Sequence, residues 1–209
     1  MAIDFESIHK NFNGVMLGLC TACGGSCEKN QITLFLPGEM EFVAGKLGMD
    51  LRAFKEKFCN TIVFKGQHIF IMKAGVCPFL NASYHCELED SNCKLTRCLL
   101  YPVIVSLVNG KAAVYLDEKG CPMTRWVPKE FTAQATEIYE EIKNELPDWW
   151  LEFVVKYDEA LYDYSKLTRH REKRFIELRE LESCMIKEWK PAPRPTPNFV
   201  QIGGTVHSC

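Results

Sequence analysis

Apolar residues at helical spacing predict several short helices in the first part of the chain. Residues 4–17 have an amphipathic pattern, and residues 38–47 follow a proline that suits a helix start. A further helix is expected from Asp50, a favourable N-cap residue, to residue 58. Residues 31–36 form a short apolar run that is typical of extended chain. The helices should therefore be short and separated by non-helical segments.

Two other segments alternate in the way that is typical of paired strands. Residues 61–72 predict a hairpin that turns near Lys65–Gly66–Gln67. In residues 103–116, the dipeptide Asn109–Gly110 separates VIVSLV from KAAVYL and suits a type I′ turn. Short helices combined with local hairpins predict an α+β fold.

The pattern changes after Pro128. Residues 130–146 are helical in pattern, and Pro147 permits a second helix to begin. The apolar stripe of this second helix has a period near 3.6 and consists of Trp150, Phe153, Val154, Tyr157, Leu161 and Tyr164. A charged helical pattern continues to about residue 190, and the tail from Pro191 is rich in proline.

These patterns divide the chain into three parts. Residues 1–127 are expected to form a cysteine-rich domain of short helices and hairpins. Residues 128–190 are expected to form a helical C-terminal region, and residues 191–209 a Pro-rich tail. The C-terminal helices are where we expect a protein partner or protein substrate to bind.

Charge and hydropathy narrow the classes of function. The formal net charge of −2 argues against a nucleic-acid-binding protein and against binding to anionic membranes. No apolar run approaches the roughly 18 residues that cross a bilayer. The segment MAIDFESIHKNF carries acids where a signal peptide would be basic and then apolar. We therefore expect a cytoplasmic protein, in a reducing environment, with no membrane segment.

Cysteine is the chemically informative residue type. The chain has eleven cysteines, an odd number that does not suit a disulfide framework in a chain of this length. Eight of them lie in a first loop, CTACGGSC, in a second stretch from Cys77 to Cys98 that is also expected to be loop, and at a position after the second hairpin. They are Cys20, Cys23 and Cys27, then Cys77, Cys86, Cys93 and Cys98, then Cys121. Thiolates at such close spacing can converge on zinc or on a [4Fe–4S] cluster, which need four ligands each. The sequence leaves open which metal binds and whether there are one or two sites.

Other candidate ligands have simpler interpretations. Cys59 and Cys184 each stand alone on a predicted helix and are expected to be buried thiols. His85 precedes Cys86 and could replace a thiolate, although a hydrogen-bonded surface histidine is the better interpretation. His207 and Cys209 end the chain and could reach a metal only if the tail docks.

The order of these motifs resembles the YkgJ-like CxxCxxCC cysteine-cluster family over residues 18–145. The resemblance rests on CTACGGSC, ITLFLPGEMEFVAGKLGMDLRAFKEKF, CPFL, CEL, RCLLYPV and a late CP. The positions that match the family's motif are Cys20, Cys23, Gly24, Cys27, Cys77, Leu80, Cys86, Cys98 and Cys121–Pro122. The resemblance implies a zinc- or iron-chelating domain whose biochemistry is largely unassigned.

The chain departs from the family pattern at two places. Ser26 occupies the position of the family's third cysteine in the first loop, and a hydroxyl is a poor ligand for a soft metal. The stretch before Cys98 lacks the family's Arg-Pro and carries Cys93, which could replace the missing ligand.

The resemblance and the thiolate set together predict an iron–sulfur protein that serves redox chemistry or cluster-dependent protein modification. The alternatives are a zinc-binding structural or interaction module and a lysine N-methylase-like enzyme. The sequence contains no G-x-S-x-G, H-E-x-x-H or P-loop motif. If the protein is an enzyme, we expect an open coordination position on the cluster to be the source of its reactivity.

Overall fold

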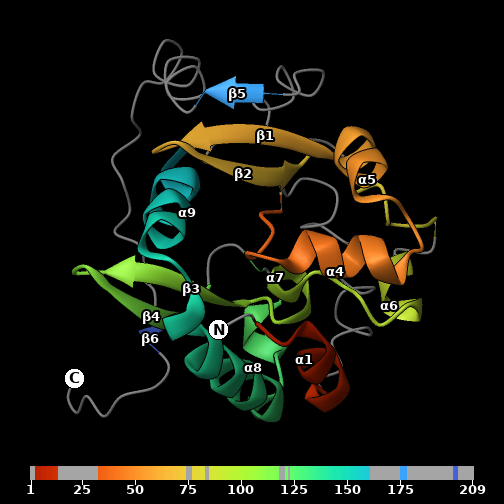
Figure 1. Cartoon of the computed structure of the whole chain (residues 1–209). Coiled ribbons are helices and arrows are strands. Elements are labelled where there is room, and N and C mark those ends of the chain that lie inside the picture. Colours follow the sequence, from red (N-terminus) through yellow and green to blue (C-terminus); the bar gives the residue numbers. More distant parts are fainter. Residues whose placement is uncertain are drawn as a thin grey trace.

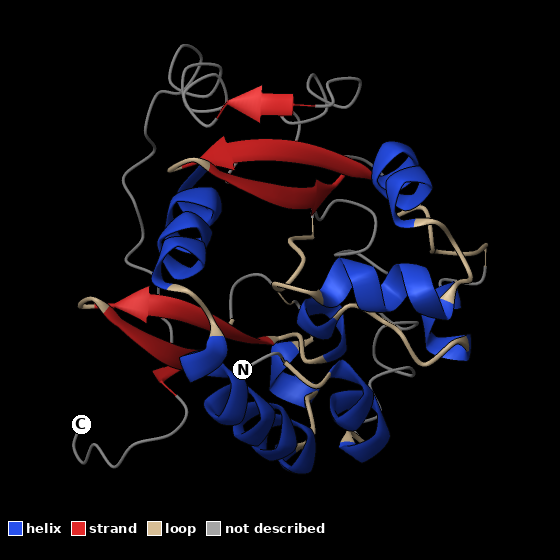
Figure 2. Ribbon diagram, in the orientation of Figure 1, coloured by secondary structure: helices blue, strands red, loops and turns tan. Residues whose placement is uncertain are grey.

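The computed structural model describes residues 3–13, 33–73, 77–82, 85–117, 121, 123–160, 175–177 and 200–201. The fold is α+β, as the sequence predicted, with helices packed against two small sheets (Figures 1 and 2). The helical elements are α1 (Phe5–Asn11), α4 (Glu39–Lys46), α5 (Leu51–Phe58), α6 (Glu87–Asp90), α7 (Thr96–Leu99), α8 (Lys129–Ile142) and α9 (Asp148–Ala160), with 3-10 turns η1 (Thr124–Trp126) and η2 (Lys143–Glu145). The strands are β1 (Cys59–Phe64), β2 (Gln67–Met72), β3 (Val103–Val108), β4 (Lys111–Leu116), β5 (Phe175–Glu177) and β6 (Val200–Gln201).

The two predicted hairpins are confirmed, and their turn residues explain them. β1 pairs with β2 across Lys65–Gly66, whose φ angles are 49° and 76°. β3 pairs with β4 across Asn109–Gly110, whose φ angles are 51° and 74°. Positive φ at both central residues defines the type I′ turn, which Asn-Gly adopts readily and which matches the twist of the flanking strands.

Each hairpin gains a third strand from the C-terminal part of the chain. β5 pairs in parallel with β1, and β6 pairs antiparallel with β4. The sequence predicted that a charged helix would reach residue 190, and this prediction is wrong at residues 175–177, which form β5. Phe175 and Ile176 make this stretch apolar, which suits pairing with the open edge of a sheet. The rest of that predicted helix and most of the Pro-rich tail lie outside the described residues.

The larger hydrophobic core lies where α1, α8 and α9 meet both hairpins. In Figure 1, α9 runs between the two hairpins. Its Trp150 is 1% exposed and donates from Nε1 to the backbone carbonyl of Phe35 at 3.1 Å. The Phe153 ring contacts Phe64 of β1 with the centroids 5.5 Å apart. Residues on both sides of the predicted 127/128 boundary thus share this core, while the boundary itself stays a prediction.

A smaller core joins α4 and α5 to the segment that carries the second group of cysteines. Phe54 is fully buried, and its ring lies 5.0 Å from that of Phe58 and 6.1 Å from that of Phe35, measured between centroids. Phe79 closes the cluster against Phe58, with the two centroids 4.8 Å apart. The cysteine-bearing segment is therefore held by aromatic packing.

Two sequence predictions need correction near the N-terminus and in the second cysteine group. The first helix ends at Asn11, because Phe12 is extended and packs its ring against Phe131 of α8; residues 14–17 lie outside the described part. The stretch from Cys77 to Cys98, expected to be loop, contains the one-turn helices α6 and α7. Helices of four residues are too short to give a periodic signal in sequence.

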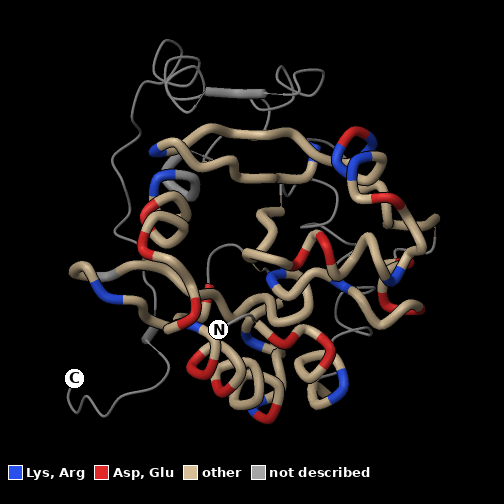
Figure 3. Tube along the Cα trace, in the orientation of Figure 1, with Lys and Arg blue, Asp and Glu red and all other residues tan. Residues whose placement is uncertain are grey.

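Basic and acidic positions both occur along the described trace, and acidic residues recur along α8 (Figure 3). Within the described ranges, no helix has both the length and the apolar character that a bilayer crossing requires.

Replacing Asp50 by alanine is expected to lower the free energy of unfolding by about 1 kcal/mol. The Asp50 carboxylate accepts from the backbone N–H of Ala53 at 3.0 Å and caps α5, as its sequence position predicted. Urea denaturation of D50A and D50N provides the measurement. D50N retains a capping oxygen and should stay close to the wild type, so an equal loss in both variants would contradict the capping role.

Candidate metal centre

The second cysteine group consists of Cys77, Cys86, Cys93 and Cys98, and tight turns fold its segment around the buried Leu88. The backbone N–H of Leu80 donates to the Cys77 carbonyl at 3.1 Å, and Leu80 forms an isolated β-bridge with Cys86. Cys86 then directly precedes α6.

The end of this segment turns back onto its beginning. Asn92 has a φ of 48°, and the Cys93 N–H donates to the Leu88 carbonyl at 2.9 Å. Cys98 lies on α7, where its N–H donates to the Leu95 carbonyl at 2.8 Å. Backbone hydrogen bonds between residues close in sequence therefore turn the chain at several points between Cys77 and Cys98.

These reversals bring the four thiols into one neighbourhood. Cys98 lies close enough to Cys77 and Cys86 for their charges to affect its pKa, and Cys93 is coupled to Cys86 in the same way. Cys93 is fully buried in the smaller core, and the other three border that core. The four cysteines, which the sequence places over 22 residues, thus belong to or border one hydrophobic cluster.

Burial keeps Cys86, Cys93 and Cys98 protonated at neutral pH when no metal is bound. It raises the pKa of Cys98 to about 12 and that of Cys93 to about 11. Burial also raises the pKa of Cys86, against a smaller opposite effect of Lys94. Because thiolates are the reactive form, these groups are not poised as nucleophiles at neutral pH.

A lysine that the sequence did not single out lies in the segment of the second cysteine group. The Lys94 side chain is only 12% exposed, and its ammonium group pairs with the Glu89 carboxylate. Burial lowers the pKa of Lys94, but the hydrogen bond and the charge of Glu89 raise it by more, and Cys86 and Cys98 act in the same direction as Glu89. A buried positive charge beside thiols favours their ionised form.

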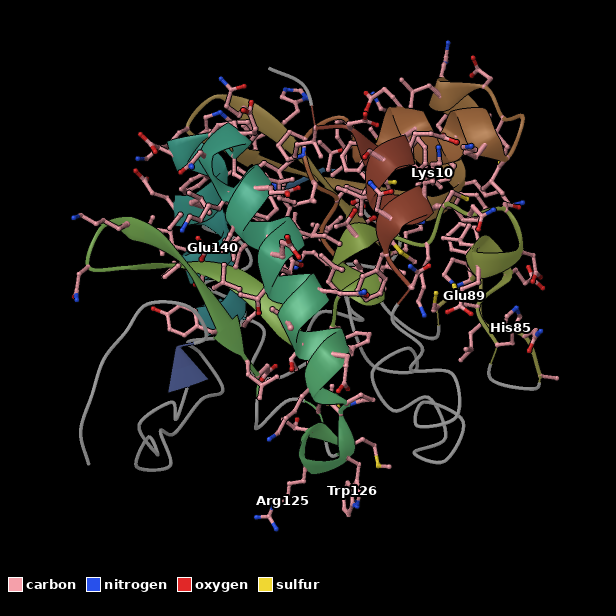
Figure 4. All side chains as sticks on the ribbon, turned by 90° about the horizontal axis from the view of Figure 1, so that it is seen from below. Lys10, His85, Glu89, Arg125, Trp126 and Glu140 are labelled. Atoms are coloured by element: carbon pink, nitrogen blue, oxygen red, sulfur yellow. The ribbon has the colours of Figure 1, made fainter. Side chains whose placement is uncertain are left out.

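His85 is held by carboxylates. Its Nε2 lies 3.0 Å from Asp90 Oδ1, and its Nδ1 lies 3.5 Å from Glu89 Oε2. Figure 4 shows His85 and Glu89 together on one side of the molecule, away from Trp126 and Arg125. The hydrogen-bonded histidine suggested by the sequence is confirmed, and Glu89 connects His85 to Lys94.

Described residues on both sides of the segment that carries Cys20, Cys23 and Cys27 lie near the second cysteine group. On the C-terminal side, Thr33 Oγ1 lies 3.5 Å from Cys98 Sγ. On the N-terminal side, burial lowers the pKa of His9 on α1, and the nearby backbone of Lys94 has a small opposite effect. The three cysteines themselves lie outside the described residues, between His9 and Thr33.

The remaining cysteines have different surroundings. Cys121 is buried after β4, where its carbonyl accepts from the Thr124 hydroxyl at 2.7 Å, and its ligand role stays a prediction. Cys59 is 3% exposed, and its thiol lies 3.9 Å from the Met40 sulfur, which confirms the expected buried thiol. Cys184, His207 and Cys209 lie outside the described residues.

Behind Cys98, a buried carboxylate ties α7 to the start of α4. Glu39 is 1% exposed; one of its oxygens accepts from the Leu36 N–H at 2.9 Å, and the other accepts from the Thr96 N–H. The buried Tyr139 hydroxyl has no hydrogen-bond partner among the described residues, and burial raises its pKa. Glu39 thus fixes the first residue of the one-turn helix that carries Cys98.

In the described ranges, no three His, Cys, Asp or Glu side chains are arranged to hold a metal ion. The second cysteine group is therefore a set of neighbouring thiols and not a complete site by itself. The donor type is nevertheless that of a thiophilic centre, because all four side chains end in sulfur.

The sequence did not indicate Lys94, Glu89, Thr33 or Glu39. Lys94 directly follows Cys93, but a lysine next to a cysteine in sequence only weakly indicates that its charge acts on the thiols. Glu39 lies in the first turn of its helix, where acids are common for reasons unrelated to a distant partner.

Comparison with models of known protein families, with characterised proteins and with solved structures gave no match to this chain. The resemblance to the YkgJ-like family therefore stays a prediction from the cysteine motifs.

Proposed function

We propose that this protein binds a metal centre through cysteine thiolates, most favourably an iron–sulfur cluster of the [4Fe–4S] type used for redox chemistry or cluster-dependent protein modification. Its ligands would come from the second cysteine group and from Cys20, Cys23 and Cys27. The sulfur-only donor set favours iron–sulfur chemistry over sites that mix sulfur with nitrogen or oxygen.

One observation carries the proposal: described residues on both sides of the first cysteine loop lie near the second cysteine group. Thr33 follows Cys27 by six residues and contacts Cys98. On the N-terminal side of the loop, His9 of α1 lies near the backbone of Lys94, which belongs to the segment that carries the second cysteine group. A loop that starts and ends at one place can deliver its thiolates there without a long excursion of the chain.

Protein purified without exposure to air is expected to be brown, with about four iron and four acid-labile sulfide per chain. Visible absorbance near ~400 nm and chemical analysis of iron, zinc and sulfide supply the measurement. A matched variant, C59A, removes a buried thiol outside the group and should retain the cluster, whereas C98S should lose it. A colourless wild type with stoichiometric zinc would exclude the iron–sulfur form.

A zinc-binding structural module is the second candidate, and the packing of the thiols favours it. Cys93 is fully buried, and the other three thiols border the aromatic cluster formed by α4, α5 and Phe79. A metal bound there would contribute directly to the free energy of folding. Chelation should then lower the melting temperature, and an unchanged melting curve after complete metal removal would contradict a structural role.

A cytoplasmic location and a protein partner are part of the same proposal. A reducing compartment keeps thiols available as ligands. α8 and α9 pack one side into the larger core, while acidic residues recur along α8. The partner would meet that outer side.

A further inference from the structure

A cavity of about 190 Å³ lies where β2 meets the first turns of α4 and α9. Residues 33–35 run beside β2, to which Leu34 is joined by a β-bridge with Ile71. The chain then turns away at Pro37 and Gly38, and Gly38, with a φ angle of 83°, starts α4 in another direction. The cavity therefore follows from the course of the backbone at this turn.

Aromatic rings form much of the cavity wall. They come from the two paired segments and from the first turn of α9, and are Phe35, Phe70, Trp149 and Trp150. Trp150 is fixed by its hydrogen bond to the Phe35 carbonyl, whereas Phe70 and Trp149 are only partly buried and remain accessible to solvent. Aromatic faces attract cations, and the ammonium group of Lys55 already lies 4.5 Å from the centroid of the Phe70 ring. The wall thus has the chemistry of a cation-binding surface.

Acidic side chains supply the charge at the cavity. Glu41 of α4 lines it with an exposed carboxylate, and no residue that the structure describes forms an ion pair with this group. Asp148, also exposed, directly precedes the two tryptophans. No lysine or arginine side chain belongs to the described lining, in which His68 is the other titratable residue. A cationic ligand would therefore meet a carboxylate here, whereas an anion would be repelled.

The volume of the cavity limits the size of the ligand. Sites for drug-sized molecules typically measure about 300–1,000 Å³, whereas a cavity of about 150 Å³ can hold one benzene ring. At about 190 Å³, this cavity suits a single compact group and is too small for a whole nucleotide or flavin. Among compact cations, an unmodified lysine ammonium is strongly hydrated, whereas a methylated ammonium presents apolar surface to aromatic walls.

We propose that this cavity binds a quaternary ammonium group, with Trp149 and Phe70 as aromatic walls and Glu41 as the opposite charge. A free small molecule of the choline type and a trimethylated lysine side chain of a protein both present such a head group. No cysteine belongs to the described lining, so the site lies apart from the second cysteine group. The inference therefore stands independently of the proposed metal binding.

Calorimetric titration of the full-length protein tests the site with two probes, choline and an acetylated trimethyllysine amide. Each probe is compared with its neutral analogue, in which a carbon atom replaces the charged nitrogen. The cations should bind saturably, and the neutral analogues should bind roughly tenfold more weakly. Tighter binding of choline would assign the site to a free small molecule, and tighter binding of the trimethyllysine probe would assign it to a modified protein.

Four variants locate the binding and separate its causes. W149L loses the aromatic face but keeps an apolar side chain, and should bind the cations roughly 3- to 30-fold more weakly. W149F keeps an aromatic face and should stay within a few-fold of the wild type. E41Q should bind roughly 2- to 5-fold more weakly, the effect of an exposed ion pair. W126L removes a tryptophan that is 62% exposed and lies outside the described lining, and should bind as the wild type does.

Several results would overturn the inference. Absence of saturable binding of both cations at millimolar concentration would exclude the site. A neutral analogue that binds as tightly as its cation would show that the cavity does not recognise charge, and a W149L protein with wild-type affinity would place the binding elsewhere. Thermal unfolding checks that each variant folds. If W149L does not fold, the exposed change E41Q decides the test, because equal affinity of E41Q and the wild type would remove Glu41 as the opposite charge.

Discussion

Replacement of Glu39 by alanine is expected to lower the free energy of unfolding by about 2–6 kcal/mol. Both carboxylate oxygens accept backbone N–H bonds in a site that is 1% exposed. Removing the side chain leaves the Leu36 and Thr96 N–H groups buried without acceptors, at a cost of about 1–3 kcal/mol each. Urea denaturation provides the measurement, and E41A, an exposed change on the same helix, should stay within about 0.5 kcal/mol of the wild type.

Glu39 also predicts a dependence of stability on pH. Burial raises the pKa of its carboxyl above 4.5, against smaller opposing effects of the Thr96 and Leu36 hydrogen bonds. In the pH range between 4.5 and the raised pKa, the folded state therefore binds a proton more tightly than the unfolded state. The resulting stabilisation is fully present below pH 4.5 and is lost as pH rises through the folded-state pKa.

The E39Q variant isolates this effect because glutamine keeps the shape and does not titrate. As pH is lowered towards 4.5, the wild type should gain stability relative to E39Q. Urea midpoints for both proteins across this range give the comparison. A difference that stays constant with pH, or that changes in the opposite direction, would contradict a raised pKa at Glu39.

Local chemistry explains which elements could be predicted from sequence. Asp50 caps α5, and Asn109–Gly110 turns the second hairpin, because the residues that determine each structure lie within a few positions of one another. The break at Pro147 between α8 and α9 has the same local origin. In these cases the predicted element and its turn or cap agree with the structure.

The candidate site depends instead on contacts between distant residues. Glu39 and Thr96 are 57 positions apart, and Thr33 and Cys98 are 65 positions apart. No pattern with a helical or strand period encodes such pairs. Cysteine spacing could therefore predict which residues are candidate ligands, whereas the buried ion pair of Lys94 and Glu89 and the anchoring of Thr33 became apparent only in three dimensions.

Zinc binding to the metal-free protein is expected to release about one proton for each thiolate that coordinates. Burial raises the pKa of Cys98 to about 12 and that of Cys93 to about 11, so both are thiols at neutral pH without metal. A coordinated sulfur is deprotonated. Calorimetric titration in buffers of different ionisation enthalpy measures the number of protons released.

The same protonation equilibria predict a steep pH dependence of affinity. Below the thiol pKa values, the apparent affinity should fall by about tenfold per pH unit for every proton displaced. Four thiolate ligands would therefore reduce the affinity by about 10⁴-fold for a drop of one pH unit. The slope of affinity against pH and the calorimetric proton count must agree, because both report the same number of thiols that ionise on binding.

Two cysteine variants separate ligands from bystanders in this measurement. C98S should release about one proton fewer than the wild type and bind more weakly, because a hydroxyl is a poor substitute for a thiolate ligand. C59A also removes a thiol whose pKa burial raises to about 12, yet Cys59 lies against Met40 and not in the second cysteine group. C59A should therefore release as many protons as the wild type. If C98S and the wild type release the same number of protons, Cys98 is not a ligand. The raised pKa does not decide this by itself, because Cys59 and Cys98 are both buried and protonated without metal.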